Sequence, residues 1–294
     1  MRVVVAGSRG LIGSALVPRL REAGHDVLRL VRRDTRSGDE RSWDPPAGRI
    51  DPGTFDGVDA VVNLCGAPLI SGRWSGARKQ LLTDSRVEPT EVLAEAVAEH
   101  GIPLLVNSSG AHYYGDTGER EADESRPAGR GFLPELCVAW EAATAPAVEA
   151  GARVVLLRNA PVLAGEGGLL GPLKPLFRLG LGARLGDGRQ YFPWIALPDQ
   201  VAAIRFVLEH DDVAGPVNMA APGVVTNAEF TKALGRAVNR PAPWWVPGPA
   251  LRVALGEAAE EMILTGPRAV PRKLVDAGFG FRHSDLGEAL AAVL

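Results

Sequence analysis

Short apolar runs alternate with amphipathic segments along the first half of the chain. The apolar runs have the length and β-branched content of buried strands and occupy residues 2–6, 26–31, 60–64, 104–108 and 154–158. Between them, apolar residues recur at helical spacing over residues 14–23, 76–100 and 134–150. This alternation predicts an α/β fold with a doubly wound parallel sheet of the Rossmann type.

The composition changes after residue 159. Glycine, proline and leucine are frequent over 165–188, and four prolines accompany Trp244 and Trp245 in 241–249. We therefore expect residues 1–160, together with 195–212, to form a nucleotide-binding domain, and most of 161–294 to form a smaller lobe over a substrate cleft. The polar segment 36–53 predicts a loop. Asp199 is expected to cap or brace a helix that begins at Gln200.

A glycine-rich turn joins the first predicted strand to the first predicted helix. In a dinucleotide-binding turn, Gly7 permits the tight bend, Gly10 lets the backbone approach a pyrophosphate, and Gly13 allows close helix packing. The alternative is a glycine-rich turn that only packs. The position between strand and helix favours the cofactor interpretation. The predicted contacts are Gly7, Ser8, Arg9, Gly10, Leu11, Ile12 and Gly13.

The second predicted strand ends in two arginines, where a ribose-reading side chain is expected. A carboxylate there suits the 2′-hydroxyl of NAD, whereas a guanidinium suits a 2′-phosphate. Arg32 and Arg33 therefore predict NADP, with Arg9 as a third contact. Two alternatives remain open: a solvated basic strand end, and a shifted register in which Asp34 is the ribose acid.

Charge and composition narrow the class of protein. The 294 residues carry a formal net charge of −3 without a long basic run, so nucleic-acid binding is not expected. No apolar stretch approaches the length of a membrane span, and Met1 leads directly into a strand, so neither membrane insertion nor a signal peptide is expected. Cys65 and Cys137 lie in apolar segments without metal-ligand spacing. These features predict a cytoplasmic protein without a metal site.

Several short segments resemble one known group of proteins. The chain resembles an atypical extended short-chain dehydrogenase/reductase, of the group called NAD-dependent epimerase/dehydratases. The resemblance rests on residues 63–68, Arg73-Trp74, 84–87, Ser108-Ser109, 113–116, Trp140-Glu141, Leu157-Arg158, 177–182, 186–190, Trp194-Ile195, 215–218 and 277–279. It implies a Rossmann domain that holds NADP(H) and a C-terminal lobe that forms a substrate cleft. It also implies further cofactor contacts at Cys65, Gly66, Ala67, Arg86 and Ser108.

The chain departs from the superfamily at its usual active site. Alignment through Glu141 puts Leu133 and Cys137 at the positions of the catalytic tyrosine and lysine, and neither residue can replace that pair. The catalytic serine or threonine aligns with Gly110. Candidate catalytic residues therefore come from the loop after the fourth strand, with the proton donor expected from Tyr113 or Tyr114. The candidates are Ser109, His112, Tyr113 and Tyr114, and the alternative is that these side chains only pack.

Three functions are consistent with this sequence. The first is an NADP(H)-dependent oxidoreductase or epimerase acting on a small polar or nucleotide-linked carbonyl or alcohol. The second, favoured by the missing tyrosine and lysine, is a catalytically weak NADP(H)-binding sensor or regulator. The third is a nucleotide-binding protein without redox chemistry. Arg73, Arg86, Arg184 and Arg189 are candidate anion contacts, and by analogy a homodimer through 76–100 and 134–150 is expected.

Overall fold

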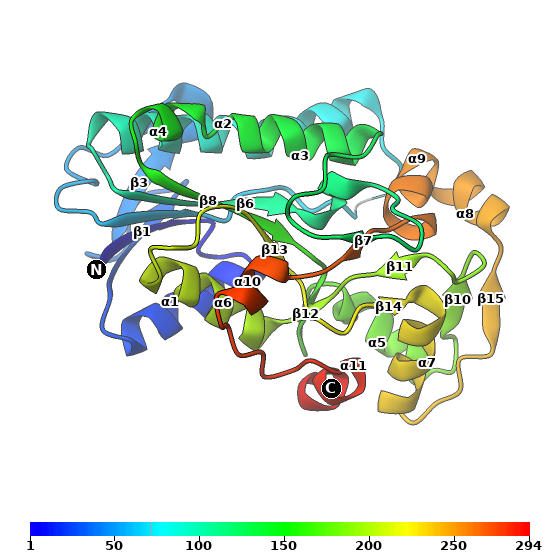
Figure 1. Ribbon diagram of the computed structural model, residues 1–294. Helices are drawn as coiled ribbons and strands as arrows, with labels where there is room; N and C mark the ends of the chain where they lie inside the picture. Colours follow the sequence, from blue (N-terminus) through cyan, green and yellow to red (C-terminus); the bar gives the residue numbers. More distant parts are fainter. Residues whose placement is uncertain (71) are drawn as a thin grey trace.

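A large twisted sheet runs through the protein (Figure 1). The computed structural model describes residues 1–70 and 72–294. Within these residues the sheet has eight strands in the order β13-β8-β6-β5-β1-β2-β3-β4, and all neighbours are parallel except β3 and β4. The strands are β1 (Arg2–Ala6), β2 (Asp26–Val31), β3 (Glu40–Asp44), β4 (Arg49–Ile50), β5 (Ala60–Asn63), β6 (Leu104–Gly110), β8 (Arg153–Asn159) and β13 (Gly215–Met219).

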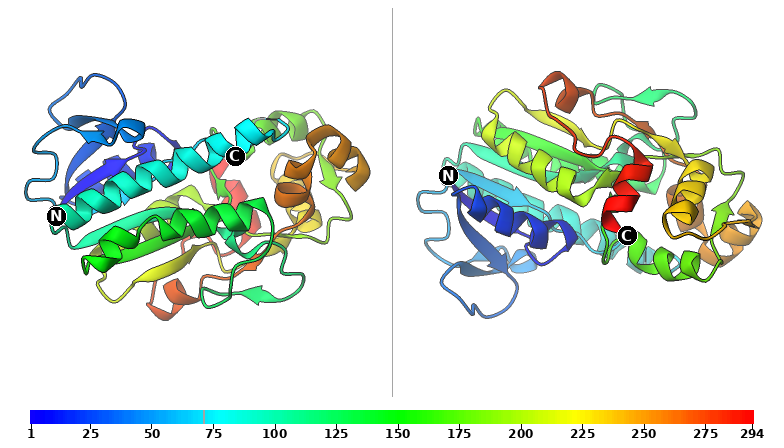
Figure 2. Two further views of the ribbon diagram at one scale, coloured as in Figure 1. Left: turned by 90° about the horizontal axis from the view of Figure 1, so that it is seen from above. Right: turned by 90° about the horizontal axis from the view of Figure 1, so that it is seen from below.

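Helices cover both faces of this sheet (Figure 2). One face carries α1 (Leu11–Glu22) and α6 (Leu197–Glu209), and the other carries α2 (Gly76–Glu99), α3 (Phe132–Ala142) and α4 (Ala145–Glu149). Strand β1 shows why the sheet needs both layers, because Val3 and Val5 pack on the α1 side while Val4 and Ala6 pack on the α2 side. The predicted doubly wound α/β fold is therefore confirmed.

Two local predictions were wrong. The segment 36–53 is not one loop, because β3 pairs with β2 in parallel and β4 returns against β3. The sequence of β3 lacks the apolar pattern that predicts a strand, because Trp43 is its only buried apolar side chain. The helix predicted over 134–150 is two helices, α3 and α4, separated at Ala143 and Thr144.

A second group of elements follows the carboxyl ends of the parallel strands, at the right of Figure 1. Its core is formed by Phe177, Trp194, Phe230 and Leu234. The short strands pair as β7 (Glu121–Ala122) with β16 (Arg268–Ala269), β9 (Val162–Leu163) with β12 (Ile195–Ala196), β10 (Ala183–Leu185) with β15 (Trp244–Val246), and β11 (Tyr191–Phe192) with β14 (Val225–Thr226). The helices of this second lobe are α5 (Leu170–Arg178), α7 (Asn227–Ala237), α8 (Gly248–Leu255), α9 (Glu257–Ala259) and α11 (Leu286–Val293). Helix α10 (Arg272–Asp276) instead packs beside β13 (Figure 1), and its Leu274 belongs to the core on the α1 side of the sheet.

Helix α6 begins earlier than predicted. Its first residue is Leu197, with Pro198 in the first turn, so Asp199 lies inside the helix and is not its cap. The Asp199 carboxylate instead accepts the backbone N–H groups of Arg282 and His283, at 2.8 and 2.9 Å. It therefore ties the segment before α11 to the α1 side of the sheet.

No helix in residues 1–70 or 72–294 has both the length and the apolar content that crossing a membrane requires. Over the same residues, side chains of histidine, cysteine, aspartate and glutamate do not gather in groups of three or more suited to a metal ion.

Candidate functional site

The strand order reverses at β1, which lies between β2 and β5. Ligands of doubly wound folds bind outside the carboxyl ends of the strands at such a point. Gly7 follows β1 with φ +76°, and a Cβ there would lie 2.6 Å from the Leu64 carbonyl oxygen after β5. A Cβ on Gly13 would lie 2.4 Å from the Gly7 carbonyl oxygen. Glycine at both positions therefore lets the start of α1 sit directly over the ends of β1 and β5.

The start of α1 is open to a ligand. A Cβ on Gly10 would approach only the Gly7 carbonyl oxygen, at 3.4 Å. Among the described residues no side chain caps this helix, and its first turn carries no acidic residue. The Ser8 hydroxyl is buried and, within residues 1–70 and 72–294, has no hydrogen-bond partner. A buried unpaired hydroxyl beside uncapped helix N–H groups has the chemistry of a phosphate cradle, so these residues fit a dinucleotide.

Two other predicted contacts in this turn are apolar. Ile12 packs against the hydrophobic core beneath the sheet. Leu11 lies close to Gly168 in the segment after β9, where its Cδ2 atom is 2.8 Å from the position that a glycine Cβ would take. Ile12 therefore fixes α1 to the sheet, and Leu11 connects it to the segment after β9. The backbone of the turn is left to contact the ligand.

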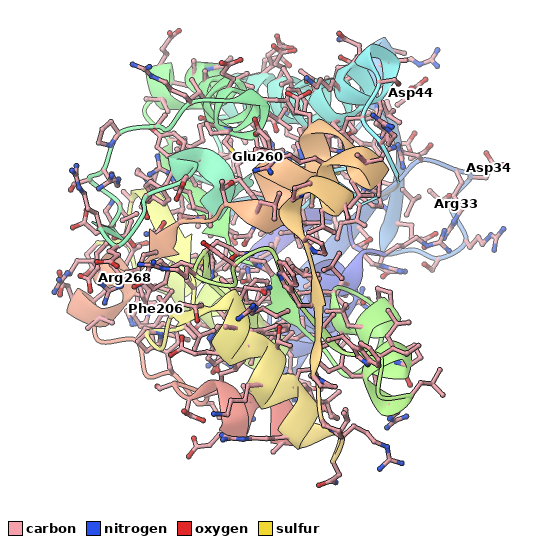
Figure 3. The ribbon with its side chains drawn as sticks, turned by 90° about the vertical axis from the view of Figure 1, so that its right-hand side faces the viewer. Arg33, Asp34, Asp44, Phe206, Glu260 and Arg268 are labelled. Atoms are coloured by element: carbon pink, nitrogen blue, oxygen red, sulfur yellow. The ribbon has the colours of Figure 1, made fainter. Side chains whose placement is uncertain are left out.

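The two arginines after β2 have different surroundings. The Arg33 guanidinium donates to both carboxylate oxygens of Glu40, at 2.7 and 3.0 Å, and the backbone N–H of Arg36 donates to the same carboxylate at 2.7 Å. Figure 3 shows Arg33 and Asp34 on the loop at this edge of the molecule. Arg32 is exposed and makes no ion pair among the described residues. Glu40 was missed by the sequence analysis because it lies in the unpredicted strand β3.

Arg32 follows β2 at the same edge of the sheet as the glycine turn, near the end of β5. Burial raises the pKa of the Cys65 thiol to about 12, and the positive charge of Arg32 acts against that rise. The arginine that remains free for an anion therefore lies on the same side as the glycine turn. Arg9 is also exposed, within that turn.

The segment after β5 is fixed by hydrogen bonds to its backbone. The Asn63 side-chain oxygen accepts the Cys65 N–H at 3.1 Å, and the Ser85 hydroxyl accepts the Ala67 N–H at 3.1 Å. Arg86 donates to the Ala67 carbonyl at 2.9 Å. Asn63 at the end of β5 and two residues of α2 therefore hold the segment 65–67, which the resemblance assigned to the cofactor.

Arg86 is a buried cation without a carboxylate partner among the described residues. Its remaining hydrogen bonds go to the Leu82 carbonyl and the Ser85 hydroxyl, at 2.9 and 3.3 Å. The guanidinium carbon lies 5.2 Å from the centre of the Trp140 ring. Burial lowers the pKa of Arg86 to about 10, so the group stays charged at neutral pH. A charge that is 7% exposed and lacks a counterion marks a place where an anion or an oxygen-rich ligand would be stabilised.

Arg86 lies beside the position of the missing lysine. The Cys137 thiol on α3 is directed at the Gly110 carbonyl, 3.7 Å away, and burial raises the pKa of Cys137 to about 12. A Cβ on Gly110 would lie 3.4 Å from the Cys137 sulfur and 3.9 Å from His112 Nδ1. Burial and the Arg86 charge lower the pKa of His112 to about 4, so its imidazole is neutral at pH 7. Gly110, His112 and Cys137 therefore form one cluster, and the Arg86 charge acts on both His112 and Cys137.

The other candidate catalytic residues belong to a buried polar network. The Tyr114 hydroxyl donates to the Asn218 side-chain oxygen at 2.7 Å and accepts from Arg158 at 2.9 Å. Burial raises the pKa of Tyr114 to about 12. The Tyr113 ring lies under the Arg158 guanidinium, 3.4 Å from its carbon. These contacts favour the packing interpretation of both tyrosines over a role as proton donor.

Glu141 completes this network. Its carboxylate accepts two hydrogen bonds from Arg158, each 2.9 Å long, and one from the Ser109 hydroxyl at 2.7 Å. Ser108 is buried one residue earlier, at the end of β6. The bidentate pair of Glu141 and Arg158 joins α3 to β8. The sequence did not predict this pair; both residues entered only as parts of segments that carry the resemblance.

The C-terminal segment reaches the start of α3. The Glu261 carboxylate accepts the backbone N–H groups of Phe132 and Leu133, at 2.9 and 2.8 Å. Lys79 on α2 forms an ion pair with Glu257. Glu260, labelled in Figure 3, pairs with Arg252 at 2.8 Å and ties the end of this segment to α8. Glu261 therefore caps α3 at the position where the superfamily carries its catalytic tyrosine.

The remaining candidate anion contacts lie elsewhere. Arg73 donates to the Val253 carbonyl at 3.2 Å, and Arg189 lies 3.8 Å from Glu119 with both side chains exposed. Arg184 is on β10, in a groove described below.

The fold and the glycine turn at the switch point define a Rossmann-type dinucleotide-binding protein. Comparison with protein families agrees, because the model described as "NAD dependent epimerase/dehydratase family" matches residues 3–135. A second model, "Domain of unknown function (DUF1731)", matches residues 246–293, which include the Glu261 cap.

Full-length relatives identify the family. The chain is 54% identical to epimerase family protein Mb2239 of Mycobacterium bovis, over 98% of this chain and 96% of that protein. It is 34% identical to human epimerase family protein SDR39U1 over the full length of both. The crystal structure of human SDR39U1 (isoform 2) with NADPH superposes with a TM-score of 0.92 at 32% identity, covering 100% of this chain and 99% of that one. The chain belongs to the epimerase family that includes SDR39U1.

Proposed function

We propose that this protein binds NADP(H) and acts as an oxidoreductase or epimerase on a small polar or nucleotide-linked carbonyl or alcohol. The observation that carries the proposal is the open cradle at the start of α1, where the buried Ser8 hydroxyl is unpaired among the described residues and Gly10 leaves room for a pyrophosphate. The crystal structure of human SDR39U1 with NADPH supports the choice of cofactor. The nicotinamide of a bound cofactor supplies hydride transfer.

Arg32 and Arg9 are the residues that we assign to the 2′-phosphate. Both are exposed, and among the described residues neither has a carboxylate partner, whereas both carboxylate oxygens of Glu40 already bind Arg33. Arg33 then has a different role from the one predicted: it holds β3 and the loop after β2 in place.

We assign the role of the missing lysine to Arg86. In the superfamily, a lysine at the position of Cys137 holds the nicotinamide ribose and stabilises negative charge nearby. In this chain the thiol of Cys137 stands at that position and is protonated, while the Arg86 charge acts on the same cluster from α2. The cation is kept although it comes from another helix.

His112 is the polar group best placed to contact the reacting oxygen of a substrate. It lies in the cluster with Gly110, where the Arg86 charge acts on it, and its neutral imidazole offers one N–H donor and one acceptor nitrogen at pH 7. The guanidinium beside it stabilises negative charge that develops on that oxygen.

A second function is favoured by the cap on α3. Leu133 has no proton to donate, and Glu261 occupies the backbone N–H group of that same residue. This arrangement suits a catalytically weak NADP(H)-binding sensor or regulator. A homodimer through α2 and the region of α3 and α4, and a cytoplasmic location, stay predictions from the sequence.

A turnover screen distinguishes the two functions. Carbonyl compounds and sugar nucleotides are incubated with the protein and NADPH or NADP⁺, and the absorbance of the reduced nicotinamide is followed; exchange of a substrate hydrogen detects epimerisation. We expect turnover that falls about 100-fold in His112→Asn, the usual scale for a lost proton-transfer or polarising group. NADPH binding without turnover would support the sensor, and a protein that binds no NADPH would refute both.

A further inference from the structure

A groove of about 470 Å³ lies in the second lobe, between α7 and the pair of strands β10 and β15. Its lining residues come from neither the glycine turn nor the cluster at Gly110. Figure 3 looks onto this side of the molecule, with α7 in yellow and β15 beside it. The residues that matter for its chemistry are Arg184, Lys232, Arg236, Arg240, Trp244 and Trp245.

The groove concentrates positive charge on a protein whose net charge is −3. Lys232 and Arg236 lie one turn apart on α7, Arg184 lies across from them on β10, and Arg240 follows α7. No carboxylate lines the groove, and within the described residues none of these four side chains forms an ion pair. Like charges brought together without a counterion repel, and an anionic ligand relieves that repulsion.

Two indole rings border the same groove. Trp244 and Trp245 are 58% and 57% exposed, which is unusual for the largest apolar side chain. Each ring is nevertheless held by its N–H group, which donates to the Gly180 carbonyl at 2.8 Å and to the Gly186 carbonyl at 2.6 Å respectively. Rigid, exposed indole faces are suited to stacking on a planar ring.

Strand pairing brings the two features together. Arg184 is directly opposite Trp245 in the parallel ladder of β10 and β15, so the two side chains leave the same face of that pair. A planar ring stacked on the indole would therefore place an attached anionic group within reach of a guanidinium. The volume of the groove lies in the range of small-molecule sites.

We propose that this groove binds a small molecule that combines a planar ring with two or more phosphate groups. The ring stacks on Trp245, and the phosphates contact Lys232, Arg236 and Arg184. This ligand is separate from the dinucleotide at the glycine turn, so both can be bound at once.

The test uses ATP as the probe on full-length protein saturated with NADPH, so that the dinucleotide cradle is blocked. Isothermal titration calorimetry should detect ATP binding. Adenosine and tripolyphosphate, which each carry half of the recognised chemistry, should bind at least 10-fold more weakly. The double variant Lys232→Gln/Arg236→Gln should weaken ATP at least 10-fold and leave the NADPH affinity unchanged. Arg205→Gln, an exposed arginine on α6 outside the groove, is the matched control and should change neither affinity.

Trp245→Ala separates the role of the ring from that of the charges. It should weaken ATP but leave tripolyphosphate binding unchanged. Circular dichroism and NADPH binding report whether each variant folds. If the double variant differs from wild type in either measurement, the single variant Lys232→Gln is used in its place. The proposal is overturned by absence of ATP binding to the NADPH-saturated protein, by equal ATP affinity in wild type and charge variants, or by an oligonucleotide that binds the groove more tightly than ATP.

Discussion

Replacement of Arg32 by alanine should remove much of the preference of this protein for NADPH over NADH. Arg32 is exposed after β2, close enough to Cys65 for its charge to act on that thiol, and it has no carboxylate partner among the described residues. A 2′-phosphate bound there gains a charge-assisted hydrogen bond. NADH has no such phosphate, so its affinity should stay the same.

The expected magnitude follows from the strength of such a bond. A hydrogen bond to a charged group contributes about 1.5–3 kcal/mol, which corresponds to roughly a 10- to 150-fold change in affinity. Because Arg32 is exposed, solvent and salt screen the interaction, and we expect the lower part of that range at physiological ionic strength. The preference should also weaken as salt is added.

Isothermal titration calorimetry with NADPH and NADH measures the effect directly. Arg33→Ala is the informative comparison, since its guanidinium is already bound to Glu40 and should contribute less to the preference than Arg32 does. Arg19→Ala, an exposed arginine on the outer side of α1, is the control. The reasoning is refuted if Arg32→Ala keeps the wild-type ratio of affinities, or if Arg33→Ala alone abolishes it.

Three further outcomes are expected. Gly10→Val should abolish NADPH binding with an unchanged circular dichroism spectrum, because its side chain enters space that only the Gly7 carbonyl borders; normal binding would show that the turn holds no phosphate. Once a substrate is known, Cys137→Ala and Tyr113→Phe should change turnover little, and a large loss in either would contradict the role given to His112. The free energy of unfolding should decrease as the pH is lowered from 7 towards 4. His112 has a pKa of about 4 in the folded protein and a pKa near 6.5 in the unfolded chain, so over this range the unfolded chain binds a proton that the folded protein does not. Urea denaturation should show a loss of about 2 kcal/mol from this group between pH 7 and pH 5, and His112→Asn should lack that part.

The sequence by itself determined the doubly wound fold, five of the eight strands of the sheet and the glycine turn between β1 and α1. These depend on local features, namely apolar runs that suit buried strands and glycines that allow a close turn. Strand β3 was missed because its two buried side chains, Glu40 and Trp43, do not form an apolar pattern that would indicate a strand.

Only the tertiary structure shows which groups surround the candidate side chains. The sequence shows Arg33 as a cation after β2, but its partner Glu40 lies on β3. The sequence ranked the tyrosines above His112, and the fold places Tyr114 against Asn218 and Arg158 instead. Residue type fixes which protons and charges a side chain can carry. Burial and neighbouring charges, contributed by segments far apart in the chain, decide which of them are free to meet a ligand.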